Sequence, residues 1–138
     1  IKHGANSADL HIIEATRFDE EEGRRCATEI LSRAPETSAL LCANDRLALG
    51  ALQATTALGL NCPSDVSITG FNDMPFLDFI PPGLTTVRIL QFEAGQTAAR
   101  HLLNMLRGNE SEVPLETILP IELIKRNSVA EPRETQQF

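Results

Sequence analysis

Two short apolar runs along the chain each end at an Asn-Asp pair. Residues 39–45 read Ala-Leu-Leu-Cys-Ala-Asn-Asp, and residues 66–73 read Val-Ser-Ile-Thr-Gly-Phe-Asn-Asp. Residues 46–58, between them, carry apolar side chains at helical spacing. This order predicts two parallel neighbouring strands joined by a helix, which places Asn44 and Asn72 side by side at the carboxyl edge of a sheet. Small ligands bind at that edge in open α/β sheets, so the pattern indicates a ligand site.

The remaining segments show the same two periodicities. Asp19, with Glu three positions later, marks the start of a helix, which we expect to end near Arg33 because Pro35 cannot continue it. The other expected elements are strands over residues 10–15, 38–43, 66–71, 84–89 and 115–125, the last interrupted by Pro120, and a helix over residues 91–107. The order of strands and helices predicts an α/β fold in which a parallel sheet is covered by helices on both faces.

The helix over residues 46–58 is apolar on more than one side. Leu47 lies on one face with Ala51 and Leu58, whereas Leu49 projects almost opposite and Leu52 lies at the flank. A helix packed only on a sheet should be polar on its back. We therefore expect this helix to contact a second subunit, with burial inside its own chain as the alternative.

Composition limits the classes of function. The net charge is −7, from 19 acidic and 12 basic residues, so these 138 residues lack the basic surface that DNA binding requires. No apolar run approaches the roughly 18 residues of a membrane span. Three cysteines without Cys-x-x-Cys spacing are typical of a reducing cytosol, and the cytoplasm is the expected location.

Catalytic and metal-binding motifs are not found in the sequence. The three histidines have no metal-ligand spacing, no nucleophile elbow or triad pattern occurs, and no glycine-rich phosphate loop is present. We expect neither an enzyme nor a cofactor or metal.

A resemblance to a known family begins at residues 43–52, Ala-Asn-Asp-Arg-Leu-Ala-Leu-Gly-Ala-Leu. The segment resembles the effector-binding core of the lactose/galactose-repressor (LacI/GalR) family of bacterial transcription regulators. The similarity continues through residues 58–60, 63–68, 70–73, 84–88, 93–95 and 119–128. It covers about residues 10–130 in the order found in the family.

The resemblance implies an incomplete type I periplasmic-binding-protein-like fold. Residues 1–88 would form most of the C-terminal subdomain, and residues 118–138 its return strand and tail. Residues 89–117 would be the crossover and a helix that belongs to the N-terminal subdomain. The rest of that subdomain and a DNA-reading headpiece are expected in a longer parent protein, in agreement with a first residue other than Met.

The resemblance also implies ligand-binding residues. Asn44 matches an effector-contacting Asn, although it could instead cap the following helix. Asn72 stands where the family commonly has an Asp that binds ligand hydroxyls, and Asp73 next to it is either a further contact or a turn cap. Phe18 matches an aromatic residue stacked on the effector, with a hydrophobic staple as the alternative. Phe76 is a weaker ligand-binding candidate.

The function implied is an effector-sensing domain of an allosteric transcriptional repressor, with a sugar or related metabolite as ligand. The parent would be a homodimer that contacts operator DNA only through its headpiece, and the expected interface residues are Leu47, Leu49, Leu52 and Phe79. One alternative is a periplasmic sugar-binding protein of a transporter, which shares the fold. Another is an interaction module without a ligand.

Overall fold

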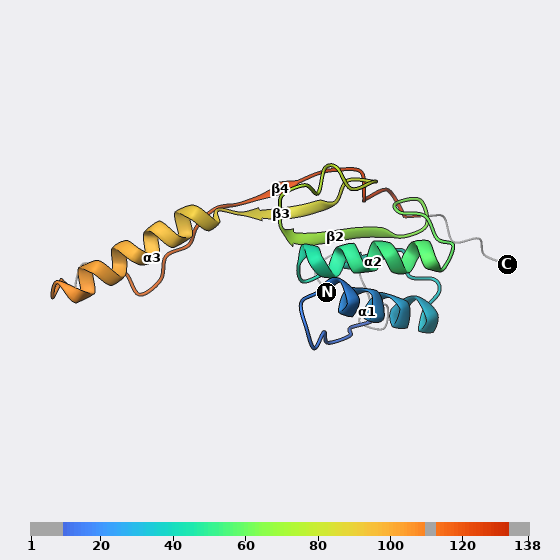
Figure 1. The fold of residues 1–138 in the computed structure, drawn as a ribbon, viewed down its shortest axis with the longest axis horizontal. Helices are drawn as coiled ribbons and strands as arrows, with labels where there is room; N and C mark the ends of the chain where they lie inside the picture. Colours follow the sequence, from blue (N-terminus) through green and yellow to red (C-terminus); the bar gives the residue numbers. More distant parts are fainter. Residues whose placement is uncertain (1–9, 110–112, 133–138) are drawn as a thin grey trace.

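The chain forms a four-stranded sheet with two stacked helices on one side and a third helix that extends away from it (Figure 1). The computed structural model describes residues 10–109 and 113–132. Strands β1, β2 and β3 are parallel, and β4 pairs antiparallel with β3, in the order β1-β2-β3-β4. The elements are α1 (Glu20–Arg33), β1 (Ala39–Leu41), α2 (Asp45–Ala57), β2 (Ser67–Asn72), β3 (Thr85–Ile89), α3 (Gln91–Leu106) and β4 (Ile121–Ile124). The predicted α/β class with a mainly parallel sheet is confirmed.

Three details differ from the sequence prediction. Residues 10–15 form no strand, because they lie across an open groove of about 970 Å³ from β1 and so cannot pair with it. Strand β4 is limited to Ile121–Ile124, immediately after Pro120, and is antiparallel. In the described part of the chain, α2 lies against the sheet with α1 beneath it, whereas α3 leaves the sheet (Figure 1). Helices on both faces are therefore not seen there.

The core is aliphatic. Its largest fully buried side chains include Val66, Ile68, Leu77 and Leu84, and Leu77 enters the core from the loop between β2 and β3. The five phenylalanines in the described residues are all at least 37% exposed: Phe18, Phe71, Phe76, Phe79 and Phe92. Since aromatic rings normally contribute large buried areas to cores, their exposure leaves them available for contacts outside the described residues.

The segment after β4 closes the body of the protein. Ser128 is fully buried, and its hydroxyl donates to the Ile68 carbonyl oxygen (2.6 Å) and accepts from the Thr85 N–H (2.8 Å). The Ser128 carbonyl oxygen accepts from the Ile68 N–H at 2.8 Å. A single residue that follows β4, Ser128, thus connects β2 to the start of β3.

Helices α1 and α2 approach each other closely at two glycines. A Cβ added at Gly23 would lie 2.2 Å from the Leu47 carbonyl oxygen, and one added at Gly50 would lie 2.0 Å from the Glu20 carbonyl oxygen. Only residues without side chains allow the backbones to come this close. The contact brings the N-termini of both helices together, and a bidentate ion pair between Arg46 and Glu20 spans them (2.8 and 2.9 Å).

Helix α3 projects from the body as an arm (Figure 1). None of its residues is buried, and the apolar side chains Phe92 and Leu106 are more than 70% exposed.

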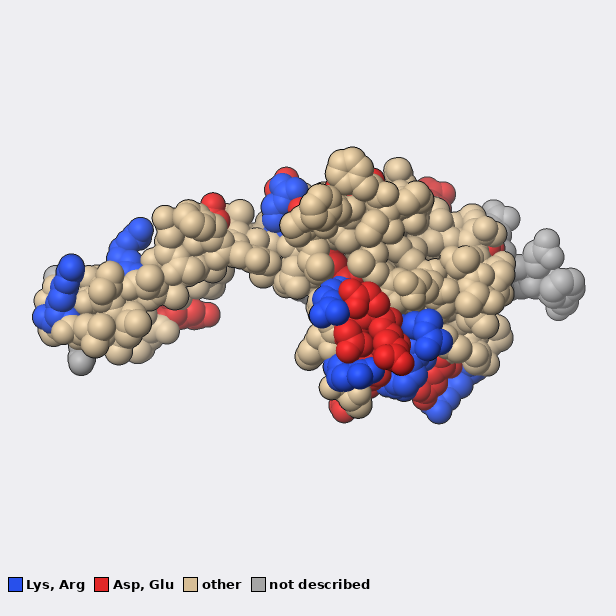
Figure 2. Space-filling model, in the orientation of Figure 1, with Lys and Arg blue, Asp and Glu red and all other residues tan. Residues whose placement is uncertain are grey.

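Charged side chains of both signs are interspersed over α1 on the body (Figure 2). Within the described ranges, no helix combines the length and apolar character that crossing a membrane would require.

Replacing Gly50 by alanine is expected to destabilise the protein by about 1–3 kcal/mol, the usual cost of overpacking, because the new methyl group meets the α1 backbone. Urea unfolding followed by circular dichroism measures this change. Gly95→Ala in α3 is the matched control, because a Cβ there meets nothing within 4 Å. Equal effects of the two substitutions would contradict the close helix contact.

Candidate ligand-binding site

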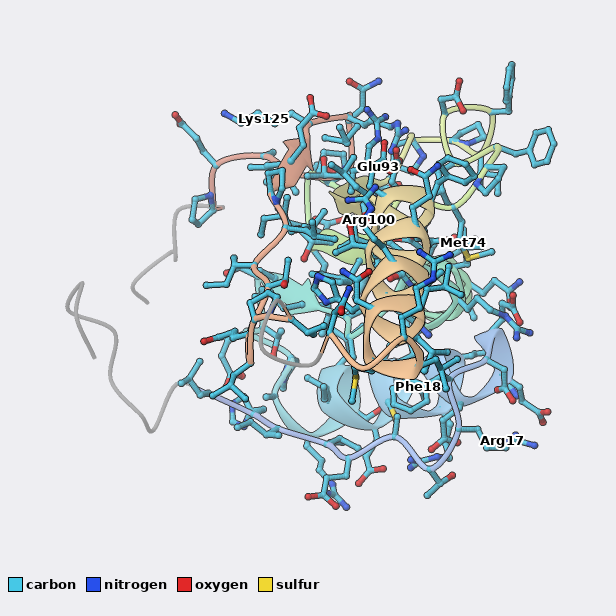
Figure 3. All side chains as sticks on the ribbon, turned by 90° about the vertical axis from the view of Figure 1, so that its left-hand side faces the viewer. Arg17, Phe18, Met74, Glu93, Arg100 and Lys125 are labelled. Carbon is cyan, nitrogen blue, oxygen red and sulfur yellow. The ribbon has the colours of Figure 1, made fainter. Side chains whose placement is uncertain are left out.

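The predicted ligand site lies at the carboxyl ends of the parallel strands, on the side of the body from which α3 projects (Figures 1 and 3). Leu41 pairs with Thr69, and the Cys42 N–H donates to the Thr69 carbonyl oxygen at 3.0 Å. Asn44 and Asn72 each follow three residues after this register pair. The structure therefore brings both amides to the same edge of the sheet, as the repeated sequence pattern predicts.

Asn44 caps helix α2. Its Oδ1 accepts a hydrogen bond from the Leu47 N–H at 2.8 Å, and its Nδ2 donates to the Phe18 carbonyl oxygen at 3.4 Å. The cap expected as an alternative role is thus present. An amide oxygen has two lone pairs and an amide nitrogen two hydrogens, so half of this group's hydrogen-bonding capacity remains beyond these two bonds.

Phe18 projects outward from the turn before α1 (Figure 3) and is 61% exposed. A hydrophobic staple would require a side chain at the fourth helical position, but that position is Gly23, which is packed against α2. The staple is therefore absent. The backbone of Phe18 lies next to Asn44, because the Phe18 carbonyl oxygen is the partner of the Asn44 amide.

Glu22 fixes the turn that carries Phe18. This carboxylate is 4% exposed, and its Oε1 accepts from the Thr16 N–H (2.8 Å), the Thr16 hydroxyl (3.0 Å) and Arg25 (2.7 Å). The hydrogen bonds from Arg25 and then from the Thr16 backbone lower the pKa of Glu22 from 4.5 to about 2, against the opposing effect of burial. The sequence analysis identified Glu22 only as part of a capping pattern.

The end of β2 and the loop after it hold three residues in backbone conformations that residues other than glycine normally avoid. Asn72, Asp73 and Phe76 have φ values of +115°, +55° and +74°. Such residues cost on the order of 1–3 kcal/mol each and persist where the surroundings enforce them. Two buried carboxylates hold this segment at Asp73 and Met74.

The first of these carboxylates is Asp45, which the sequence analysis did not single out. It is fully buried, and its two oxygens accept from the Thr86 hydroxyl (2.6 Å) and the Met74 N–H (2.8 Å). A Cβ at Gly70 would lie 2.3 Å from Asp45 Oδ1, so glycine is required beside it. Asp45 thus joins the start of α2, strand β3 and the loop after Asn72.

The second carboxylate is Asp73, whose side chain is 8% exposed. Its oxygens accept from Arg88 (2.7 Å) and Arg126 (2.8 Å). Burial alone would raise the pKa of Asp73, but the hydrogen bonds from Arg126 and Arg88 outweigh it and lower that pKa. Both oxygens are occupied within the chain, so we exclude Asp73 from the ligand contacts proposed below.

The remaining predicted residues lie in three environments, exposed, buried and partly buried. Phe76 and Phe79 are 71% and 76% exposed, with ring centroids 6.5 Å apart. Leu47 is 5% exposed and buried beneath α1, so it is not available to a second subunit. Leu49 and Leu52 are partly buried against the core.

The described part of the chain shows no reactive thiol or metal cluster. Cys26, Cys42 and Cys62 are unpaired, and burial chiefly raises the pKa of Cys42 to about 12. No three His, Cys, Asp or Glu side chains among the described residues gather to hold a metal ion.

Comparison with known proteins relates this geometry to a family. Residues 2–129 match the periplasmic binding protein-like domain. The regulator MalR of Streptomyces coelicolor is 36% identical over 126 residues, which are 91% of this chain and 36% of MalR. A LacI-family regulator of Enterococcus faecium with bound ribose has a TM-score of 0.74 and 34% identity, over 86% of this chain and 43% of that one. The lac repressor dimer bound to operator and the anti-inducer ONPF has a TM-score of 0.73 and 31% identity, over 80% and 38%.

The chain therefore belongs to the periplasmic binding protein-like domain family. Within that family it is part of a core domain of the lactose/galactose-repressor type, which confirms the expected relationship. It spans about a third of the length of the curated relative MalR.

The Glu22 pKa predicts an acid-dependent loss of stability. A carboxyl whose pKa falls from 4.5 to about 2 on folding stabilises the folded state fully above about pH 4.5, and this contribution is lost as the pH falls toward 2. Thermal unfolding between pH 7 and pH 3 should show a steeper acid decline in the natural protein than in Glu22→Gln. Parallel curves for the two proteins would contradict the assigned role.

Replacing Asp45 by alanine should destabilise the protein by roughly 2–6 kcal/mol, because two buried donors lose their acceptor at about 1–3 kcal/mol each. Urea unfolding measures the change. Asp78→Ala, on an exposed position of the neighbouring loop, is the control and should stay within about 0.5 kcal/mol of the natural protein. A loss of similar size in the control would show that the buried bonds are not the cause.

Proposed function

We propose that this chain is the effector-sensing part of a bacterial transcriptional regulator, acting as a ligand-controlled repressor. The observation that carries the proposal is that Asn44 and Asn72 end neighbouring parallel strands at one edge of the sheet, where the Asn44 amide bonds to the backbone of Phe18, whose ring is exposed. A flat apolar face together with paired donors and acceptors suits a sugar ring, whose C–H face stacks while its hydroxyls form hydrogen bonds.

The ligand class follows from the chemistry of these side chains. The proposed contacts are Phe18, Asn44 and Asn72, with Phe76 at the margin. All are neutral, so the site suits a neutral polyhydroxyl compound or a heterocycle with both donors and acceptors. The structure of the Enterococcus faecium relative contains ribose, which supports the sugar class for the present chain. No catalytic activity, metal or cofactor is part of the proposal.

The transmission of the signal would depend on the rest of the parent protein. We assign residues 89–117, which include the exposed helix α3, to an N-terminal subdomain that covers the ligand from the other side. A homodimer, with Leu49, Leu52 and Phe79 as the proposed interface, would couple subdomain closure to a DNA-reading headpiece in the cytoplasm. The lac repressor structure is a dimer bound to operator, which supports this arrangement.

A transporter-associated sugar-binding protein has the same fold and remains the alternative class. The matched relatives are transcription regulators, and they favour the sensing role. An interaction module without a ligand would show no binding in the following experiment.

Calorimetry of the full-length parent protein against ribose, lactose, maltose and free purine bases tests the proposed function. For a sugar that binds, Asn72→Asp should tighten affinity roughly 2- to 30-fold, because a charged acceptor contributes about 1.5–3 kcal/mol per hydrogen bond against about 1 for a neutral one. Phe18→Ala should weaken the same sugar at least about fivefold, by loss of the stacking face.

Asn109→Asp, on the turn beyond α3, is the matched control for the added charge and should leave affinity unchanged. Binding of no compound from either class would reject the ligand-sensing role. Binding that is unaffected by both Asn72→Asp and Phe18→Ala would reject this location of the site.

A further inference from the structure

The buried carboxylate of Asp73 lies where three parts of the chain meet. It follows Asn72 directly in the loop after β2, and its two oxygens are held by arginines from two other segments. Arg88 belongs to β3, which leads into α3, and Arg126 lies two residues after the end of β4, which returns from α3. One side chain therefore connects the proposed ligand contact to both strands by which the chain leaves and re-enters the body.

Each arginine also forms a bond to the other strand of the β3–β4 pair. Arg126 Nη1 donates to the Leu84 carbonyl oxygen at 2.8 Å, and its backbone N–H donates to the Thr85 hydroxyl at 3.0 Å. Arg88 Nη1 donates to Glu122 at 3.2 Å, and Arg88 and Glu122 are register partners in the β3–β4 ladder. The two arginines and two carboxylates balance in charge, so the group has no net charge.

The inner part of this cluster is more buried than its outer part. Asp73 is 8% exposed and Arg126 18% exposed, whereas Arg88 and Glu122 are 43% and 65% exposed. Removal of one partner from a buried ion pair leaves an uncompensated charge, which costs far more than loss of an exposed pair. The bonds at Asp73 therefore dominate over the outer Arg88–Glu122 contact.

We propose that Asp73 is a positioning residue that holds Asn72 and the crossover strands β3 and β4 as one unit, so that a ligand bound at Asn72 changes the position of α3. The proposal rests on the proposed function for its ligand step, but the mechanical link itself is a property of the ligand-free protein. The positive φ values of Asn72 and Asp73 agree with a loop whose conformation is imposed by these bonds.

Hydrogen exchange of the full-length parent protein, measured by mass spectrometry, tests the link without a ligand. Asp73→Asn should speed exchange at least about tenfold in peptides from β3, from β4 and from residues 72–76 together, since exchange reports local opening. Glu122→Gln removes the exposed member of the cluster and is the matched control, with little change expected. Faster exchange in residues 72–76 alone would overturn the proposal.

A second variant and a measurement with added sugar separate loss of the link from a folding defect and from failure of the proposed function. If Asp73→Asn does not fold, Arg88→Gln removes the bond from β3 to Asp73 together with the exposed bond to Glu122, while the Arg126–Asp73 bond stays. This variant should speed exchange in β3 and residues 72–76 together; no change in β3 would overturn the proposal. With ribose, lactose or maltose as the probe, at a concentration that saturates the variant, Asp73→Asn should lose any ligand-induced change in β3 and β4 exchange. The absence of sugar binding in the natural protein would count against the proposed function alone, because the ligand-free measurement still tests the link.

Discussion

The close approach of α1 and α2 at Gly23 and Gly50 is the constraint on which the proposed site depends. Because no side chain separates the two backbones there, the N-termini of both helices lie beside each other at one end of the body. Phe18 precedes one helix and Asn44 precedes the other, so their hydrogen bond is a direct result of the packing. A larger residue at either glycine would separate the Phe18 carbonyl oxygen from the Asn44 amide, although neither of these two residues is changed.

The fold could be predicted from the sequence where local patterns and sheet pairing agree. The cap at Asp19, the helix over residues 46–58 and the parallel pairing of β1 with β2 were all evident from periodicity and turn residues. Residues 10–15 have an equally apolar pattern but form no strand, because a strand requires a partner at hydrogen-bonding distance and β1 lies across a groove. Periodicity shows which face of a segment is apolar, but it does not show whether another strand lies beside that segment.

The candidate site could be predicted only where a local sequence pattern indicates it. The repeated Asn-Asp ending identified the edge of the sheet, but it gave no basis for deciding which residue of each pair faces a ligand. In the structure the second member of each pair, Asp45 or Asp73, is a buried acceptor with partners 15 to 53 positions away in the sequence. Such long-range bonds leave no local pattern, although a carboxylate next to a buried strand end is a signal that deserved weight. The roles of Asn44 and Asn72 toward a ligand stay predictions.

The burial of Ser128 has a consequence for synthesis of the chain. This residue connects Ile68 to Thr85 through its hydroxyl, yet it follows α3 and β4 in the sequence. The body therefore cannot be completed on the ribosome until the projecting arm has been made and the chain has returned. During that interval, the nascent chain exposes the main-chain groups of Ile68 and Thr85 together with the apolar surface of the arm, which makes this a stage at which association with chaperones or with another copy would matter most.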